Sequence, residues 1–221
     1  MSSIFKKNKL FFTLCTLFVA FCSLQTLFYD KGSLVLYLNS LHTPLGNTFF
    51  KLITNIGDGL AFVIVSVLLL VFVKIRWGII GLLTFGVSGL LSQFFKKIVF
   101  GDLPRPLKFF EGKEILQTVD GVHNAFIHSF PSGHTTTAFA MFTLIALFWS
   151  SNKAVAVICF ALAVTTAISR IYLAQHFIED VFAGTILGML SATFLYFWLE
   201  VKAPRLLASP RLDYPLLKLK K

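Results

Sequence analysis

Long apolar runs, separated by short polar stretches, dominate the chain. A helix needs about 17–25 apolar residues to cross a hydrocarbon core of about 30 Å, and a near absence of charge distinguishes such a span from the core helix of a soluble domain. The pattern therefore predicts an all-α fold, a bundle of six transmembrane helices. The six runs cover residues 10–29, 57–74, 77–95, 134–150, 153–169 and 178–199.

Two segments between the runs carry structure of another kind. Residues 41–56 have apolar side chains at helical spacing, with Thr43 as an N-cap before Pro44, and predict a short amphipathic helix at the membrane interface. The polar insert 96–133 is the longest, and an insert of this length in a compact protein is usually functional. We predict a single membrane domain over residues 1–221, with a large outer loop between the third and fourth spans.

The composition agrees with a membrane protein. Of the 221 residues, 56% are hydrophobic and 14% are charged, whereas soluble domains average about 25% charged residues. Nucleic acid is not expected as a partner, because the Lys and Arg residues have almost no polar face on which to cluster. Cys15, Cys22 and Cys159 fall within apolar runs, where we expect buried free thiols. No small-residue cleavage site follows the first run, which we interpret as a retained helix.

The distribution of charge predicts the orientation of the spans. The net charge of +10 comes from 20 Lys and Arg against 10 Asp and Glu. If the N-terminus lies in the cytoplasm, the whole positive excess falls on the cytoplasmic side, in agreement with the positive-inside rule. Trp77, Trp149 and Trp198 then lie at cytoplasmic span ends, where aromatic belts form. We predict a multi-pass protein with both termini in the cytoplasm and the large loop outside.

Three polar clusters interrupt the apolar chain, and all three fall at the outer ends of predicted spans. They lie within residues 96–106, 131–134 and 169–180. Charged groups at such positions cost energy unless they are paired or solvated, so by default they indicate a functional site. The clusters contain Lys96, Lys97 and Arg105, then Pro131-Ser132-Gly133-His134, and finally Arg170, His176 and Asp180.

These residue types suit the binding and transfer of a phosphate group. Cations, a serine hydroxyl and the backbone N–H groups at a helix start form a cradle for a phosphate-like anion. His176 and His134 can divide the roles of nucleophile and general acid. Asp180 follows His176 by four residues, shares its helix face and can orient its imidazole. Because the sequence has no acidic triplet and no paired-histidine motif, we expect no metal and no cofactor.

Two of the clusters resemble signatures of a known family. The PSGH sequence at 131–134, and Ser169-Arg170 with His176 further along, are similar to the second and third signatures of the type 2 phosphatidic acid phosphatase family. Vanadium haloperoxidases and glucose-6-phosphatase belong to the same superfamily. In motif order and span pattern, the resemblance runs from about residue 45 to residue 195.

The first signature of that family is altered in this chain. Its pattern is Lys, six residues and Arg-Pro, but seven residues separate Lys97 from Arg105 here. We assign the lysine role to Lys97 and assume a one-residue insertion within 101–104. Lys96 is the alternative.

The resemblance implies a role for each site residue. His176 would attack phosphorus and form a phosphohistidine, and Asp180 would orient it. His134 would protonate the leaving oxygen and later activate water. In the family a single metal-free site does this work. The groups that would hold the phosphate oxygens are Lys97, Arg105, Ser132, the N–H of Gly133, and Arg170.

The resemblance also implies a lipid phosphatase of the bacterial cytoplasmic membrane, with its site near the outer surface. The substrate would be a phosphomonoester or diphosphate of a lipid, such as a phosphatidate-like lipid, undecaprenyl diphosphate or lipid A. Two alternatives stay open: transfer of the phosphate to a second lipid, and a non-catalytic protein that binds or transports lipid. The spans disfavour a soluble haloperoxidase. The oligomeric state stays open too, and we expect Asp120, His123 and His128 to be solvated loop residues.

Overall fold

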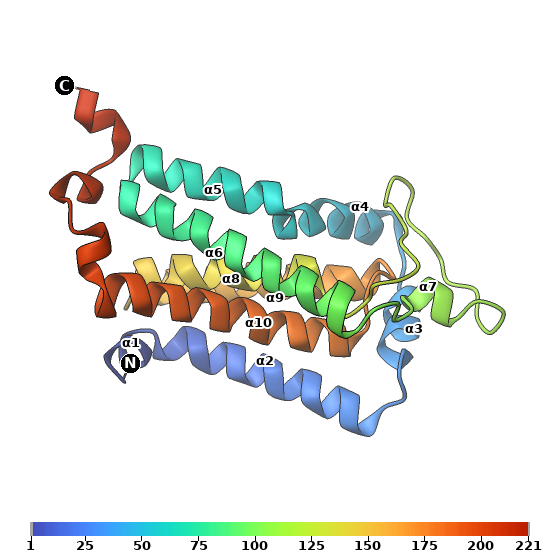
Figure 1. Ribbon diagram of the computed structural model, residues 1–221. Helices are drawn as coiled ribbons and strands as arrows, with labels where there is room; N and C mark the ends of the chain where they lie inside the picture. Colours follow the sequence, from blue (N-terminus) through green and yellow to red (C-terminus); the bar gives the residue numbers. More distant parts are fainter. Residues whose placement is uncertain (1, 221) are drawn as a thin grey trace.

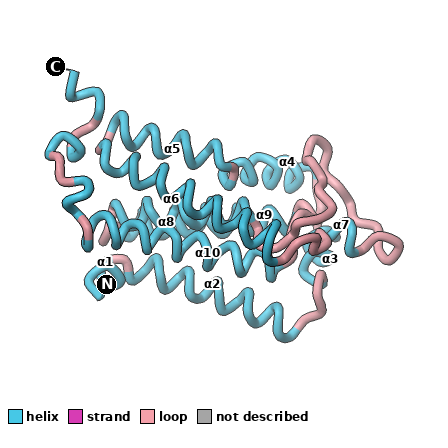
Figure 2. Tube along the Cα trace, viewed as in Figure 1, coloured by secondary structure: helices cyan, strands magenta, loops and turns pink. Residues whose placement is uncertain are grey.

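The computed structural model describes residues 2–220, and this part of the chain forms helices, turns and loops without a strand (Figures 1 and 2). The predicted all-α class is confirmed. A 3₁₀ turn at Thr54–Gly57 joins two helices, and π-helical turns extend two others at Phe95–Val99 and Phe197–Lys202. The helices are α1 (Ser2–Lys7), α2 (Lys9–Phe28), α3 (Ser33–Ser40), α4 (Pro44–Ile53), α5 (Gly59–Phe72), α6 (Ile75–Phe94), α7 (Pro106–Phe109), α8 (Gly133–Phe148), α9 (Lys153–Tyr172) and α10 (Ile178–Tyr196).

The long helices form one bundle around α8. Figure 1 shows α2, α5, α6, α8, α9 and α10 running along a common direction, with α3, α7 and the long loop gathered at one end. The N-terminal helix and the C-terminal turns lie at the opposite end. Helix α8 contacts α5, α6, α9 and α10, and most of its side chains are buried. Its first turn therefore lies at the loop-bearing end of the bundle, surrounded by other helices.

In the described part of the chain, four helices are long and apolar enough to cross a membrane, which supports a multi-pass membrane protein. A fifth crossing results if α4 and α5, which are bent by 58°, count as one span. Helix α8 is apolar but has only 16 residues, a length of about 24 Å. Neighbouring helices enclose α8, so protein contacts rather than lipid surround it. Each of the six predicted runs is helical, but the length criterion supports four to five spans.

The segment predicted as an interfacial helix is continuous with the next span. Thr43 Oγ1 accepts a hydrogen bond from the N–H of Gly46 at 3.1 Å, so the predicted N-cap is confirmed. Helix α4 then passes through the 3₁₀ turn into α5. At Gly57 in this turn a Cβ atom would lie 2.8 Å from the carbonyl oxygen of His134. The absent side chain thus lets the bend touch the start of α8.

The apolar pattern did not indicate helix α3. This helix and α4 pack against the end of α9. The ring of His42 stacks on Tyr172 with centroids 4.2 Å apart. The hydroxyl of Tyr172 donates to Asn47 Oδ1 at 2.8 Å. The bent segment is therefore held against the polar end of α9.

Two glycines bring α8 and α10 close together. A Cβ atom on Gly184 would lie 2.7 Å from the carbonyl oxygen of Ser132, and one on Gly188 would lie 2.9 Å from the N–H nitrogen of Ala140. Small residues at a four-residue spacing allow helix backbones to approach in this way. The glycine pair serves packing within the chain and places the first turn of α8 beside the first turn of α10.

The outer faces of the bundle suit a lipid environment. Leu17, Leu90 and Leu190 are more than half exposed, on three different helices. The three cysteines are buried and unpaired, as predicted. Exposed aliphatic side chains on long helices are unfavourable in water and normal against hydrocarbon.

Candidate active site

A cavity of about 500 Å³ opens at the loop-bearing end of the bundle. The α4–α5 bend, the end of α6, the start of α8 and the α9–α10 connection surround it, and the long loop borders it from outside. Among the described residues that line it, none is acidic. These residues are Lys51, Thr54, Asn55, Gln93, Lys96, Arg105, Gly121, Val122, His123, Ala125, Gly133, His134, Arg170, Gln175 and His176.

His176 lies at the bottom of the cavity with its imidazole fixed by Asp180. Its Nδ1 is 3.2 Å from Asp180 Oδ2, and both side chains are almost fully buried. A carboxylate can only accept, so Nδ1 donates the hydrogen bond and the lone pair of the neutral ring is on Nε2. The same carboxylate oxygen accepts from Ser129 Oγ at 2.5 Å and from the N–H of Phe177 at 2.9 Å. The carboxylate is thereby held in one orientation.

The start of α8 supplies His134 and Gly133, which both line the cavity. Ser132 is the N-cap of this helix, and its Oγ accepts from the N–H of Thr135. Its own N–H donates to the carbonyl oxygen of Asp180 at 3.0 Å. Ser132 is fully buried and is absent from the cavity wall. The structure thus places it as a link between α8 and α10, beside the cavity rather than in it.

Arg170 and Arg105 both point into the cavity but are held differently. Arg170, the more buried, donates through Nη1 to Thr54 Oγ1 at 2.5 Å, and its Nε has no hydrogen-bond partner in residues 2–220. Arg105 donates through Nε to the carbonyl oxygen of Ile127 at 3.0 Å and through Nη1 to Gln175 Oε1 at 3.3 Å. Each guanidinium keeps donors available for an anion in the cavity.

Of the neighbouring pair Lys96 and Lys97, the residue that lines the cavity is Lys96, which differs from the expected assignment to Lys97. Lys96 is 8% exposed, and its Nζ lies 3.9 Å from the position of a Cβ on Gly133. Lys97 is exposed and does not line the cavity. Successive residues on a helix differ by about 100° in direction, so Lys96 and Lys97 point to different sides of the helix. The π-helical turn, closed by the N–H of Phe100 on the carbonyl of Phe95 at 2.9 Å, absorbs an extra residue here.

Burial and nearby cations shape the ionisation of His176 and Arg105. The pKa of His176 lies well below its ordinary value, because burial and then the charges of Arg105, Lys96 and Arg170 disfavour the imidazolium. His176 is therefore neutral at physiological pH, as a nucleophile must be. Burial also lowers the pKa of Arg105, while the opposite charge of Asp180 raises it.

Several cavity residues were not singled out by the sequence motifs. Lys51, Thr54 and Asn55 share one face of the α4–α5 bend, and polar residues at this spacing beside an apolar span are the signal that could have revealed them. Gln175 directly precedes His176 and lies within the third signature, but the signature assigns it no role. Ser129, Gln175 and Thr54 act through tertiary contacts that no spacing encodes.

The loop residues divide between the cavity and the surface. His123, expected to be solvated only, is exposed but lines the cavity. The carbonyl oxygen of Asp120 accepts from Lys51 Nζ at 2.5 Å. His128 instead lies 3.0 Å from the carbonyl oxygen of Gly101, through Nδ1, and away from the cavity.

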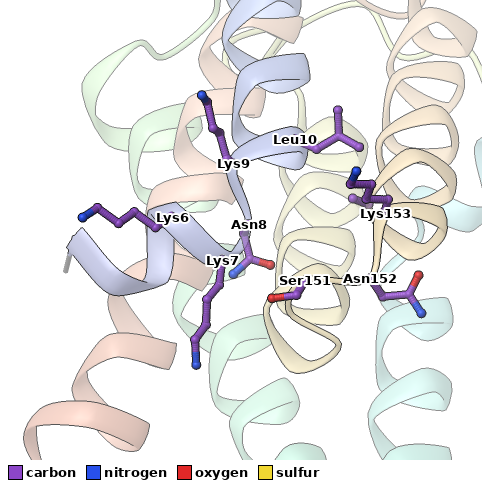
Figure 3. Close-up of a pocket in the computed structure, with 9 residues that line it drawn as sticks. Lys6, Lys7, Asn8, Lys9, Leu10, Ser151, Asn152 and Lys153 are labelled. Carbon is purple, nitrogen blue, oxygen red and sulfur yellow. The ribbon is translucent and has the colours of Figure 1, made fainter.

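A second cavity, of about 400 Å³, lies at the opposite end of the bundle (Figure 3). Lys6, Lys7, Lys9 and Lys153 line it, together with Asn8, Leu10, Ser151, Asn152 and Ala156. Figure 3 shows the side chains of Lys6, Lys7 and Lys9 pointing in different directions. Its described lining includes neither histidine nor acid, so it lacks groups for nucleophilic or acid–base chemistry. The histidine-containing cavity is the candidate active site.

The fold and the site together define a class of protein: a membrane-bound enzyme of phosphate chemistry. A helical bundle with apolar outer faces encloses a cavity that combines two histidines with several cations. The chain belongs to the PAP2 superfamily, whose family model matches residues 77–203, more than half of the chain. This confirms the family that the PSGH and Ser-Arg signatures indicate.

Known relatives agree with this membership. Phosphatidylglycerophosphatase B of Bacillus subtilis is 32% identical over 160 residues, which cover 67% of this chain and 67% of that protein. Lipid A 1-phosphatase of Rhizobium etli is 33% identical over 101 residues, 46% of this chain and 41% of that protein. The crystal structure of LpxE from Aquifex aeolicus superposes with a TM-score of 0.63 at 25% identity, covering 75% of this chain and 93% of that one. The chain is a phosphoric ester hydrolase of this family.

Proposed function

We propose that the protein hydrolyses a lipid phosphate through a phosphohistidine at His176. The observation that carries this proposal is the arrangement at the bottom of the cavity. Asp180 holds Nδ1 of a neutral, buried imidazole, and three cations surround the place where its Nε2 is presented. A fixed nucleophile next to fixed positive charge is what phosphoryl transfer requires of a protein.

The reaction takes two steps. In the first, Nε2 of His176 attacks phosphorus, the bond from phosphorus to the lipid oxygen breaks, and His134 gives that oxygen a proton. In the second, His134, now neutral, takes a proton from water, the water oxygen attacks phosphorus, and the nitrogen–phosphorus bond breaks. Inorganic phosphate leaves, and both histidines return to their starting states.

Several cationic side chains and one backbone N–H group bind the phosphate oxygens. In this proposal Lys96 replaces Lys97 as the first-signature lysine, because Lys96 lines the cavity and Lys97 does not. Arg170, Arg105 and the N–H of Gly133 complete the set, and the Ser132 hydroxyl positions the start of α8. No metal is needed, since cations stabilise the charge of the transition state and, within residues 2–220, no carboxylate lines the cavity to hold a divalent ion.

The substrate is a lipid with its phosphate at head-group depth, because the cavity lies at the end of a membrane bundle. The relatives' names support phosphatidylglycerophosphate and lipid A as candidate substrates, beside phosphatidate-like lipids and undecaprenyl diphosphate. The excess of basic residues near both ends of the chain supports six spans with cytoplasmic termini and a site on the outer face of a bacterial cytoplasmic membrane.

The test is release of inorganic phosphate from this panel of lipids by the purified protein in detergent. We expect turnover of at least one lipid in the presence of a chelator, inhibition by vanadate, and complete loss of turnover in His176→Ala. Acid-labile labelling of the protein by ³²P-lipid identifies the phosphohistidine. Unchanged turnover in His176→Ala would refute the mechanism. Transfer of label to a second lipid without free phosphate would instead establish a phosphotransferase, and binding without turnover a lipid carrier.

A further inference from the structure

The mouth of the active-site cavity carries a cation that the phosphate-transfer chemistry leaves unused. Lys51, on α4, is half-buried and lines the cavity. Its Nζ donates to the carbonyl oxygen of Asp120 at 2.5 Å. Within residues 2–220, no carboxylate oxygen lies within 4.0 Å of Nζ. Its charge is therefore satisfied in part only, by one backbone dipole.

The helix geometry places Lys51 one layer outside the transferred phosphate. Thr54 follows it by three residues and accepts the hydrogen bond from Arg170 Nη1, at the bottom of the cavity. Three residues of helix rise about 5 Å. The burial of these lining residues gives the same order, since Thr54 and Arg170 are buried and Lys51 is half-buried. Lys51 thus faces whatever is attached to the outer side of that phosphate.

The long loop completes this outer layer from the other side. Gly121, Val122 and His123 line the cavity there, and His123 is exposed at its rim. Gly121 has φ of 74°, and a Cβ atom in its place would lie 2.5 Å from Lys51 Nζ. The loop backbone therefore comes close to the lysine, and the imidazole of His123 lines the same cavity.

The charge of the cavity calls for more than one phosphate. Four cations line it, Lys51, Lys96, Arg105 and Arg170, and no acidic residue does among those described. A phosphomonoester carries at most two negative charges. The three positive charges of Lys96, Arg105 and Arg170 already exceed this number. A volume of about 500 Å³ leaves room for a second group of similar size.

We propose that Lys51 and His123 form a subsite for the second phosphate of a lipid diphosphate, so that Lys51 determines specificity for diphosphates over monophosphates. This inference rests on the proposed function, because it takes the inner phosphate to be the one attacked by His176. The second phosphate shares one bridging oxygen with the first, which keeps it within reach of a lysine one helical turn away. It displaces the Asp120 carbonyl from Nζ, and it becomes part of the leaving group.

The test compares a prenyl diphosphate with the monophosphate of the same prenyl chain. For Lys51→Gln, the ratio of kcat/KM for diphosphate to that for monophosphate should fall about tenfold or more, since a hydrogen bond between charged groups is lost. Most of the change should appear in KM for the diphosphate. Lys51→Arg should restore most of the ratio. Lys108→Gln is the matched control, because Lys108 is an exposed lysine on α7 that does not line the cavity and is paired with Glu111 at 2.8 Å.

The outcomes separate this inference from the proposed function. An equal loss on both lipids in Lys51→Gln, or no loss on either, would overturn the subsite and leave hydrolysis at His176 standing. A ratio that falls equally in Lys108→Gln would also overturn it, since bulk charge would then be the cause. If the wild-type protein releases phosphate from neither prenyl lipid but hydrolyses another lipid of the panel, the subsite is overturned and the proposed function stands. If it releases phosphate from no lipid of the panel, the proposed function itself fails.

Discussion

Replacing each of two neighbouring lysines by methionine tests which of them serves the site. Lys96 is 8% exposed, and its Nζ lies beside the backbone of Gly133 at the start of α8. Lys97 is exposed and outside the cavity. Removal of one fixed donor from a transition-state cradle lowers kcat by about 10²–10³-fold, whereas an exposed charge contributes about 1 kcal/mol or less, which is less than tenfold. We therefore expect a loss of about 10²-fold or more for Lys96→Met and less than tenfold for Lys97→Met.

The assay is steady-state release of inorganic phosphate from the best lipid of the panel, with both variants at matched folded concentration. Methionine retains the length of the lysine stem and removes only the ammonium group, so the helix and its π-helical turn should persist. Thermal unfolding in detergent checks that they do. A larger loss for Lys97→Met would refute the placement of Lys96 in the cavity, and equal losses would show that neither lysine has a specific position at the phosphate.

Three further predictions follow from buried contacts. Thr54→Val removes the acceptor of the Arg170 guanidinium and should lower kcat/KM about 10- to 100-fold; a change below twofold would contradict a positioning role. His176 is neutral when folded but titrates near pH 6.5 when unfolded, so the unfolded state binds more protons in acid, and stability should fall below about pH 6.5 by up to about 1.4 kcal/mol per pH unit. His176→Gln should reduce that slope in thermal unfolding, and an identical slope would count against a depressed pKa. Gly188→Leu should lower Tm, because even its Cβ would lie 2.9 Å from the Ala140 nitrogen; an unchanged Tm would mean that α8 and α10 can separate without loss.

Much of the fold follows from the apolar pattern, because a bilayer makes the length and apolarity of each span a requirement on the sequence. The apolar pattern predicts a span less well where other helices, rather than lipid, surround a helix. Helix α8 falls short of a span at 16 residues, since other helices enclose it. The 58° bend between α4 and α5 and the short helix α3 depend on contacts such as those of Tyr172, which lies far along the chain.

The residues of the candidate site could also be predicted only in part from the sequence. Histidines and arginines in recognisable motifs could be placed from the sequence, and the structure brings His134, His176, Arg105 and Arg170 into one cavity. The spacing of the family motif favours Lys97 if one residue is inserted within 101–104, whereas the lysine of this pair that lines the cavity is Lys96, where the chain has a π-helical turn. A π-helical turn rotates the direction of every later side chain around the helix axis. The residue types in the sequence do not predict where such a turn occurs.

The catalytic groups are positioned by the same contacts that close the bundle. Ser132 donates its N–H to the carbonyl of Asp180, and Gly184 leaves space for the carbonyl of Ser132, so α8 and α10 are joined at the point where each carries a histidine or its partner. On the other side, Gly57 lets the α4–α5 bend touch the carbonyl of His134. The distance between His134 and the phosphate-binding groups therefore depends on how closely these helices pack. Gly184 and Gly57 therefore do more than allow helices to pack, because they also determine where the catalytic groups lie.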